Sequence, residues 1–188
     1  LLHDDVADNS PVRRGEPTIM SLLGGRASVL LGDYWLVKGI ESVLSVNTFS
    51  GKVIRIFSNT LSDLAEGELL QLQKADTCDT TESDYYRIIY NKTASLFVAS
   101  ANTAAISVSA SDEKRKAAKL YAECLGIAFQ IKDDIFDYEG GDLTGKPSGL
   151  DLEERKITLP LLGAFVNAGE DMEKEIRALV ARADEDAE

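Results

Sequence analysis

GIAFQIKDDIFDY, residues 126–138, is the stretch that decides the fold of this chain. It continues a run that starts at Ala117, in which apolar residues fall on nearly every face of a helical wheel. Only Lys119, Glu123 and Gln130 noticeably interrupt the apolar pattern. The run therefore predicts a helix that is packed on most of its sides rather than one that lies on the surface.

Three aspartates gather at the end of this helix. Asp133 and Asp137 are four residues apart and Asp134 and Asp137 three, so all of them share one face. Like charges at this spacing repel, carboxylates at a helix C-terminus oppose the macrodipole, and burying an unpaired carboxylate is costly. A cation should offset these terms, and Mg²⁺ suits a few carboxylates completed by water and phosphate. A solvated acidic helix end is the alternative for one such cluster.

A second acidic cluster stands near the start of the chain. Residues 1–8 are expected to form the last turns of a helix that ends at Asn9-Ser10-Pro11, since proline cannot continue it. Asp4, Asp5 and Asp8 repeat the spacing of the first cluster. Two such clusters at helix ends indicate a shared counter-charge. Arg13 and Arg14 follow and match phosphate oxygens, although a solvated pair or a salt bridge to Asp8 is the alternative.

Composition narrows the class of protein. The chain has 188 residues, of which 44% are hydrophobic, and its four prolines favour a globular, helical protein with one core. A net charge of −12 argues against a nucleic-acid partner, because phosphate backbones select basic surfaces. Cys78 and Cys124 lack metal-ligand spacing and are expected to be reduced thiols of an intracellular protein. No apolar run is long enough for a membrane span.

The remaining pattern is one of long helices joined by short loops, which predicts an all-α domain. Asp33 is expected to be a buried hydrogen-bond partner within its helix. Residues 80–84 carry the capping side chains and first-turn acids of a helix start. Helices are expected over residues 18–46, 50–75, 85–108, 111–139, from about 160 and over 171–183.

Three lysines supply positive charge near these clusters. Lys92, followed by Thr93, is the one cation after Arg87 on the apolar helix over residues 85–108. A buried ammonium without a partner is costly, so Lys92 needs an anion. Lys146 and Lys156 belong to or follow a loop rich in glycine, proline and serine, which either folds over a phosphate or is a plain surface turn. The loop lacks P-loop spacing.

These pieces describe a site for a diphosphate on an apolar tail. Mg²⁺ held by both clusters would neutralise the diphosphate, and lysines and arginines would bind its remaining oxygens. The chain has one histidine, His3, and shows no nucleophile set. Metal-assisted departure of a leaving group needs none, provided that the site shelters a cation from water.

Several motifs of the sequence resemble those of a known family. HDDVAD at residues 3–8 with RRGEPT at 13–18 resembles the first aspartate-rich motif of the trans-isoprenyl diphosphate synthases, the polyprenyl synthetase family, and FQIKDDIFD at 129–137 resembles the second. Lys92-Thr93, Gly145-Lys146 and KITLP at 156–160 stand where the family has its other diphosphate ligands. The gap of two residues between Asp5 and Asp8 resembles the medium- and long-chain enzymes.

The resemblance implies an all-α bundle around a central cavity, usually a homodimer, that condenses an allylic diphosphate with isopentenyl diphosphate in the cytoplasm. It implies two or three Mg²⁺ ions and no membrane span, although a long product would draw the protein to a membrane surface. Asp4, Asp5, Asp8, Lys92, Thr93, Gln130 and Asp133 are the residues that it makes catalytic. The implied metal ligands are Asp4, Asp5, Asp8, Asp133, Asp134 and Asp137. The implied substrate ligands are Arg13, Arg14, Lys92, Thr93, Gln130, Lys146 and Lys156.

The sequence also departs from the family. The sequence lacks the family's N-terminal helices, which bind isopentenyl diphosphate, and the family's C-terminal part. Residues 1–188 are therefore expected to be a single, partial domain. In the family, the residues that set product length lie before the position of Leu1. The chain length of the product therefore cannot be predicted from this sequence. A short-chain geranyl or farnesyl synthase and a non-catalytic regulatory subunit of a heteromeric synthase stay open as alternatives. A terpene cyclase is disfavoured because Asp133, Asp134 and Asp137 are all present. Without a metal, we expect this helix end to fray or to rely on Lys132 and Lys146.

Overall fold

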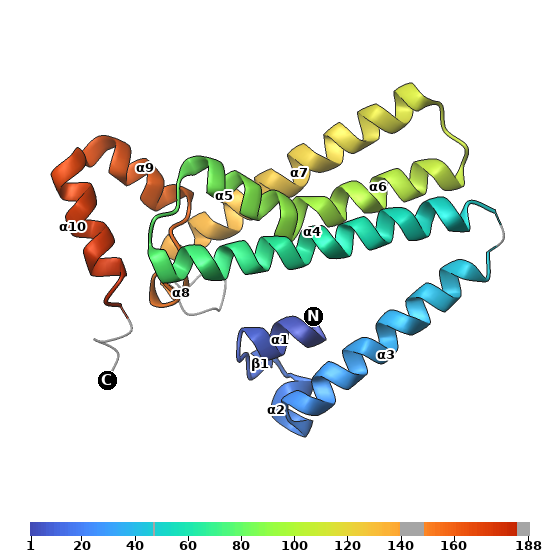
Figure 1. Cartoon of the computed structure of the whole chain (residues 1–188), viewed down its shortest axis with the longest axis horizontal. Helices are drawn as coiled ribbons and strands as arrows, with labels where there is room; N and C mark the ends of the chain where they lie inside the picture. Colours follow the sequence, from blue (N-terminus) through green and yellow to red (C-terminus); the bar gives the residue numbers. More distant parts are fainter. Residues whose placement is uncertain (47, 140–148, 184–188) are drawn as a thin grey trace. The chain divides into compact units, whose positions relative to one another are not determined.

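The computed structural model describes residues 1–46, 48–139 and 149–183, and over this part of the chain it is α-helical apart from one very short hairpin (Figure 1). It consists of two compact units, residues 1–55 and residues 56–188, and the boundary falls inside the helix α4 (Ser50–Thr77). The expectation of an all-α fold is confirmed, and that of one partial domain stays a prediction.

The first unit contains α1 (Leu2–Ala7), β1 (Val12–Arg13), β2 (Glu16–Pro17), α2 (Ile19–Leu23) and α3 (Gly25–Leu44). The single helix expected over residues 18–46 is interrupted at Gly24, whose φ of 85° lies in the left-handed region that glycine tolerates. Thr18 caps α2, because its hydroxyl accepts a hydrogen bond from the Ser21 N–H at 3.2 Å. A short helix, α2, and a long one, α3, therefore replace the single helix that was expected.

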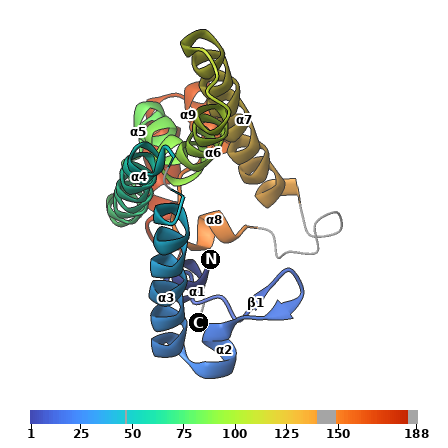
Figure 2. The same cartoon turned by 90° about the vertical axis from the view of Figure 1, so that its right-hand side faces the viewer.

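The strand pair β1–β2 was not expected from the sequence. Val12 pairs with Pro17 and Arg13 with Glu16 in antiparallel register, and Arg14 and Gly15 form the turn with φ values of 54° and 81°. Two consecutive positive φ values are the signature of the two-residue turn that matches the twist of a hairpin. Figure 2 shows this hairpin extending from the end of α1. It fixes the arginine pair directly after the first aspartates.

Helix α1 packs closely on α3 inside the first unit. The Ser28 hydroxyl is fully buried and donates to the Leu2 carbonyl at 2.8 Å. Gly32 lies so close to His3 that a Cβ atom there would stand 2.5 Å from the imidazole Cε1 atom. The imidazole Nε2 lies 3.0 Å from Asp33 Oδ1. The expectation that Asp33 is buried is wrong, because its side chain is 61% exposed, although it does have a hydrogen-bond partner.

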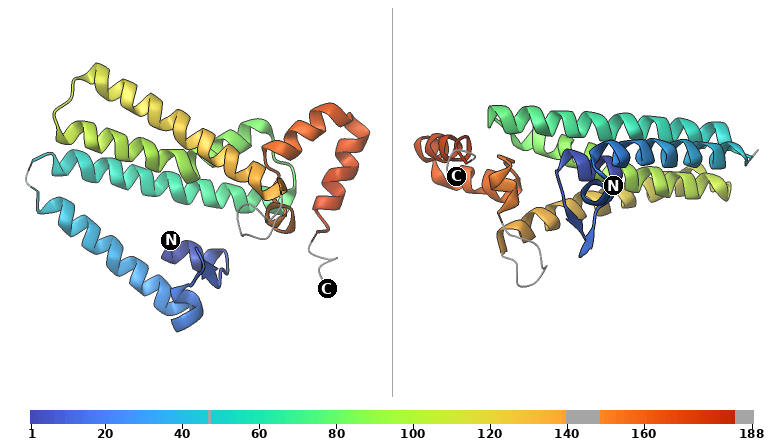
Figure 3. Two further views of the ribbon diagram at one scale, coloured as in Figure 1. Left: turned by 180° about the vertical axis from the view of Figure 1, so that it is seen from behind. Right: turned by 90° about the horizontal axis from the view of Figure 1, so that it is seen from below.

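The second unit holds the rest of α4 and the remaining helices. Helices α6 and α7 lie side by side and antiparallel (Figures 1 and 3). The helix expected over residues 85–108 is present, but a π-helical turn, η1, divides it. The elements that follow α4 are α5 (Glu82–Ile89), η1 (Tyr90–Ala94), α6 (Ser95–Ser107), α7 (Asp112–Glu139), α8 (Leu150–Glu153), α9 (Leu159–Ala168) and α10 (Glu170–Val180).

The core of this unit forms where the end of α4, α5, α9 and α10 meet. Partly buried Ile127 and Ile131 of α7 pack against it. Its buried members are Cys78, Tyr85, Ile89, Ile157, Leu162, Phe165 and Val180. Cys78 is buried here and Cys124 is exposed.

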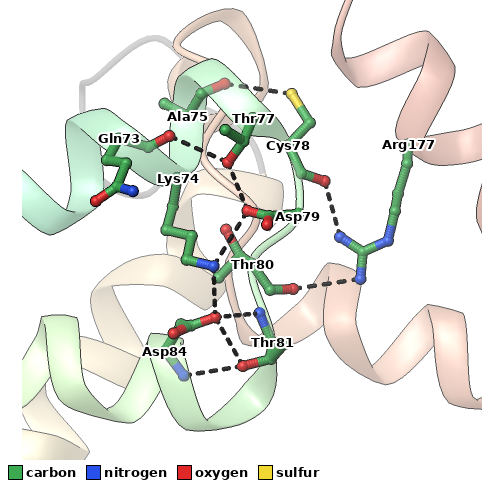
Figure 4. Close-up of polar contacts among 10 residues, drawn as sticks. All are labelled: Gln73, Lys74, Ala75, Thr77, Cys78, Asp79, Thr80, Thr81, Asp84 and Arg177. Carbon is green, nitrogen blue, oxygen red and sulfur yellow. Dashed lines mark hydrogen bonds and ion pairs between the residues drawn. The ribbon is translucent and has the colours of Figure 1, made fainter.

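Arg177 of α10 joins the C-terminal helices to the connection between α4 and α5 (Figure 4). Its guanidinium donates to the carbonyls of Cys78 at 2.9 Å and Thr80 at 3.2 Å, and it lies over the Phe165 ring at 4.4 Å. Both carbonyls follow the C-terminal end of α4, where carbonyl groups have no partner within the helix. One side chain therefore satisfies the backbone where three helices meet.

None of the helices in the described ranges combines the length and the apolar character that crossing a membrane requires.

Candidate functional site

Asp134 is the buried member of the second aspartate cluster, with 5% of its surface exposed. Its Oδ2 accepts a hydrogen bond from the Tyr85 hydroxyl at 2.6 Å, and its Oδ1 accepts one from Gln130 Nε2 at 2.8 Å. Burial raises the pKa of Asp134, and the bonds from Tyr85 and Gln130 partly oppose that shift. The carboxylate is thus held from two helices at once.

Gln130 extends this contact to the π turn. The Thr93 hydroxyl donates to Gln130 Oε1 at 2.7 Å. Because Gln130 uses its nitrogen on Asp134 and its oxygen on Thr93, both ends of the amide have partners. Thr93 and Gln130, which the sequence predicted to line the same site, are therefore brought together.

Lys92, next to Thr93, has the anion that the sequence required. Its Nζ lies 2.9 Å from the carboxylate of Glu68 and donates to Gln71 Oε1 at 3.3 Å. Both partners come from α4. The side chain of Lys92 is only 33% exposed, so a charged partner offsets most of its desolvation.

The π turn itself is tightly enclosed. A Cβ atom on Gly67 of α4 would stand 2.8 Å from the Lys92 backbone nitrogen, and one on Gly126 of α7 would stand 2.6 Å from Ala94 Cα. Two glycines thus let neighbouring helices approach the backbone of η1 on either side. Short π-helical turns are found frequently at functional sites. Here the turn carries Lys92 and Thr93 toward different helices.

Asp137 has a different role from Asp134. Its carboxylate accepts the backbone N–H groups of Leu150 at 3.2 Å and Asp151 at 3.1 Å, and so holds the first turn of α8. Helix α7 continues to Glu139, and the expectation that its end either frays or relies on Lys132 and Lys146 stays a prediction. The Nζ of Lys132 lies over the Phe136 ring, 5.1 Å from its centre. Lys146 lies outside the described residues.

Asp151 is a site residue that the sequence analysis did not single out. Its burial, followed by the nearby Asp134 and Asp137, raises its pKa to about 7, and Lys156 acts in the opposite direction. Lys156 also forms an ion pair with Glu154. The predicted cation Lys156 is therefore placed with the second cluster. The sequence signal was weak, because Asp151 looked like one more loop acid.

In the first unit, Asp5 is the buried aspartate, with 4% of its surface exposed. It binds Arg13 through Nε at 2.5 Å, so the local salt bridge of the arginines is made with Asp5. Asp5, Arg13 and Arg14 line one open pocket of about 380 Å³ together with Glu16 and Thr18. Asp4 and Asp8 are exposed. The first motif thus places carboxylates and guanidinium groups around one hollow.

The donor chemistry of these residues fits Mg²⁺, which prefers carboxylate oxygens and commonly takes only one or two of them beside phosphate and water. Asp133 is exposed and carries such a donor. Within the described ranges, no group of three or more His, Cys, Asp or Glu residues is gathered closely enough to hold a metal ion.

The family model for polyprenyl synthetases matches residues 1–188. The chain belongs to the polyprenyl synthetase family. It is 40% identical over 181 residues to the octaprenyl diphosphate synthase of Escherichia coli, covering 96% of this chain and 55% of that protein. It is 38% identical to an all-trans-nonaprenyl-diphosphate synthase of Rhodobacter capsulatus, again covering 96% of this chain and 55% of the relative.

Solved structures agree with this polyprenyl synthetase assignment. A decaprenyl diphosphate synthase from Rhodobacter capsulatus superposes with a TM-score of 0.87 at 40% identity, covering 97% of this chain and 56% of that one. A polyprenyl synthase from Caulobacter crescentus, solved with calcium and isoprenyl diphosphate, superposes with a TM-score of 0.86 at 36% identity, covering 97% of this chain and 56% of that one. The fold is the all-α isoprenoid synthase fold. The chain spans little more than half the length of these relatives.

Proposed function

We propose that this protein is a Mg²⁺-dependent prenyltransferase that condenses isopentenyl diphosphate with an allylic diphosphate and releases diphosphate. The observation that carries the proposal is the hydrogen-bonded line from Thr93 through Gln130 to Asp134, with Lys92 on the same π turn. It joins motif residues far apart in the sequence into one polar strip along otherwise apolar helices. Membership of the family supports the same reaction class.

The roles of individual residues follow as proposals. Asp4, Asp5, Asp8, Asp133 and Asp137 would hold Mg²⁺, which supplies the positive charge that makes diphosphate a good leaving group. The sixth aspartate, Asp134, is buried and accepts a hydrogen bond on each of its two oxygens. Arg14 would bind isopentenyl diphosphate. The allylic diphosphate would be bound by Arg13, Lys92, Lys146 and Lys156.

In the reaction, the allylic C–O bond breaks and its electron pair leaves with the diphosphate. The isopentenyl double bond then attacks the allylic cation and forms the new C–C bond, and the adjacent proton passes to the released diphosphate. Thr93 and Gln130 would line the reacting centre with oxygen atoms, while the apolar faces of the helices exclude water.

We further propose a medium- or long-chain product. The relatives at 38–40% identity are octaprenyl and nonaprenyl synthases, and short-chain synthases of two methanogens reach 32% and 34%. A homodimer in the cytoplasm stays part of this proposal on the strength of the family resemblance.

The test is a product assay on the full-length protein. With Mg²⁺, an allylic diphosphate primer and labelled isopentenyl diphosphate, we expect a longer prenyl diphosphate whose length chromatography reports. Chelation of Mg²⁺ should abolish the product, and D133N should lower the yield by at least about 100-fold, as loss of a transition-state electrostatic contact does.

Asp171→Asn, which changes an exposed carboxylate of α10, is the matched control and should leave the yield unchanged. Absence of product with every primer tested would contradict the proposal. Product that appears only with a second subunit, identified by mass spectrometry of the purified complex, would favour the regulatory alternative.

A further inference from the structure

Tyr85 is a core tyrosine with a single polar atom, and that atom is used on Asp134. The residue is 2% exposed and belongs to the hydrophobic cluster of the second unit. Its hydroxyl donates to Asp134 Oδ2 at 2.6 Å, which is short for a hydrogen bond between two oxygen atoms. Burial raises the pKa of Tyr85, so the phenol keeps its proton and stays a donor.

This contact fixes the direction of every hydrogen bond beyond it. An ionised carboxylate only accepts hydrogen bonds, so the Gln130 end that faces Asp134 must be the amide nitrogen. The amide oxygen then faces Thr93, whose hydroxyl proton is spent on it. Toward a ligand, the Thr93 hydroxyl can therefore only accept a hydrogen bond. The polarity of the line is thus set at its buried end, by Tyr85 and Asp134.

The same geometry separates Asp134 from its neighbour Asp133. Asp134 is almost fully buried and receives a donor on each of its two oxygens, whereas Asp133 is exposed. A metal ion with its bound water has access to an exposed carboxylate and not to one closed in by a phenol ring and an amide.

We infer that Tyr85 and Asp134 are positioning residues that orient Gln130, and through it Thr93, and that Asp134 acts on this hydrogen-bond line rather than on the metal. The inference rests on the proposed function. It reassigns one of the six aspartates and adds a tyrosine that no motif marks.

The experiment compares three variants of the full-length protein, Y85F, D134N and D133N, by two readouts. The first is binding of Mn²⁺ with inorganic diphosphate, measured by calorimetry, and the second is the split between kcat and KM for condensation at saturating Mg²⁺. For Y85F and D134N we expect Mn²⁺–diphosphate affinity within about twofold of the wild type. Their kcat should fall at least tenfold, toward the ~100-fold that a misplacement of about 1 Å can cost.

D133N should show the opposite pattern, with clearly weaker Mn²⁺–diphosphate binding. Y86F is the matched control, because Tyr86 is exposed and its ring meets Tyr85 edge-on at 5.5 Å between centroids. It removes the same atom one residue away and should change neither readout. All variants are compared below their unfolding midpoints, and D134N, which keeps the shape of the side chain, decides the matter if Y85F does not fold.

Two results would overturn the inference. In the first, D134N weakens Mn²⁺–diphosphate binding as much as D133N does, which would make Asp134 a metal ligand. In the second, Y85F or D134N retains the wild-type kcat. A wild-type protein that binds no Mn²⁺–diphosphate and makes no product would instead contradict the proposed function, so the two failures are distinguishable.

Discussion

Lys92 and Arg13, which we propose as ligands of the allylic diphosphate, are each held by a carboxylate. Lys92 lies against Glu68 at 2.9 Å and Arg13 against Asp5 at 2.5 Å, in two different units. Each pair satisfies a charge that burial would otherwise penalise. A diphosphate that binds at either residue therefore meets a side chain that is already oriented, and the neighbouring carboxylate is then free to share a cation with it.

At the start of α5, Asp84 is a residue whose charge stabilises the fold. It forms a capping box with Thr81 and an ion pair with Lys74 at 2.9 Å (Figure 4). The bond from Lys74, followed by that from Thr81, lowers the pKa of Asp84 to about 2. A lowered folded-state pKa means that the stabilisation is present above the unfolded value near 4 and is lost as pH falls toward 2.

We therefore expect Asp84→Asn to be less stable than the wild type by about 1 kcal/mol at pH 7, as for the loss of a helix cap. The difference should shrink as pH falls from 4 to 2, and urea unfolding at each pH measures it. Glu82→Gln changes an exposed acid in the same first turn and should have a smaller effect. A stability difference between wild type and D84N that is equal at pH 7 and pH 2 would refute this account.

At the scale of elements, the packing of α6 and α7 depends on Gly126. No side chain fits there, because a Cβ would stand 2.6 Å from Ala94 Cα and 2.9 Å from Ala94 Cβ. The backbone of the π turn cannot move away as a flexible side chain would. Any residue larger than glycine must therefore separate α7 from η1 or unwind the turn.

Gly126→Ala is expected to lower the free energy of unfolding by about 1–3 kcal/mol, the usual cost of overpacking. Gly163→Ala in α9 is the control, because a Cβ atom there would meet no other atom within 4 Å and alanine favours a helix by up to about 1 kcal/mol. Denaturant unfolding of both variants provides the comparison. If G126A is as stable as G163A, the helices are not in the close contact described.

Elements also show where sequence reasoning succeeded and where it failed. Residues 80–84 predicted a helix start that the capping box of Thr81 and Asp84 confirms. The apolar run before Asp133 does form a helix, but the expectation that this helix is packed on most of its sides is wrong, because Leu120, Tyr121 and Phe129 are each more than half exposed. The break at Gly24 and the hairpin turn at Arg14 were missed. Both depend on a positive φ at one or two residues, which a hydrophobic period does not reveal.

The sequence predicted which charged residues belong to the site, but not which side chains they pair with. The need of Lys92 for an anion followed from the cost of a buried ammonium, but Glu68 could not be chosen from the many acids of this chain. The shared face of Asp133, Asp134 and Asp137 followed from helical spacing, whereas their different partners depend on α5 and α8. Tyr85 was missed because a tyrosine on an apolar helix face has the pattern of any core residue.

At the scale of the whole molecule, the proposed reaction requires both aspartate clusters to act on one substrate. Asp4 and Asp133 are exposed members of the two clusters and belong to different units. Residues that share no ligand contribute additively to binding, whereas residues that share one are coupled.

A double-mutant cycle tests this requirement. Calorimetry of Mn²⁺ with inorganic diphosphate should show that D4N and D133N each weaken binding, and that the double variant differs from their sum by at least about 0.5 kcal/mol. The pair D4N and D171N is the control and should be additive, because Asp171 is an exposed acid of α10. Additivity in both pairs would mean that the two clusters bind separately.

The π turn has one more consequence, which concerns the number of residues in the chain. Its Ser95 N–H reaches the carbonyl of Tyr90, five residues back, so η1 holds one residue more than an α-helix would use. Because the π turn takes up this additional residue in one widened turn, deleting one residue here would restore a regular helix and remove the widened turn that carries Lys92 and Thr93. The number of residues in this helix is therefore as much a part of the site as the identity of its side chains.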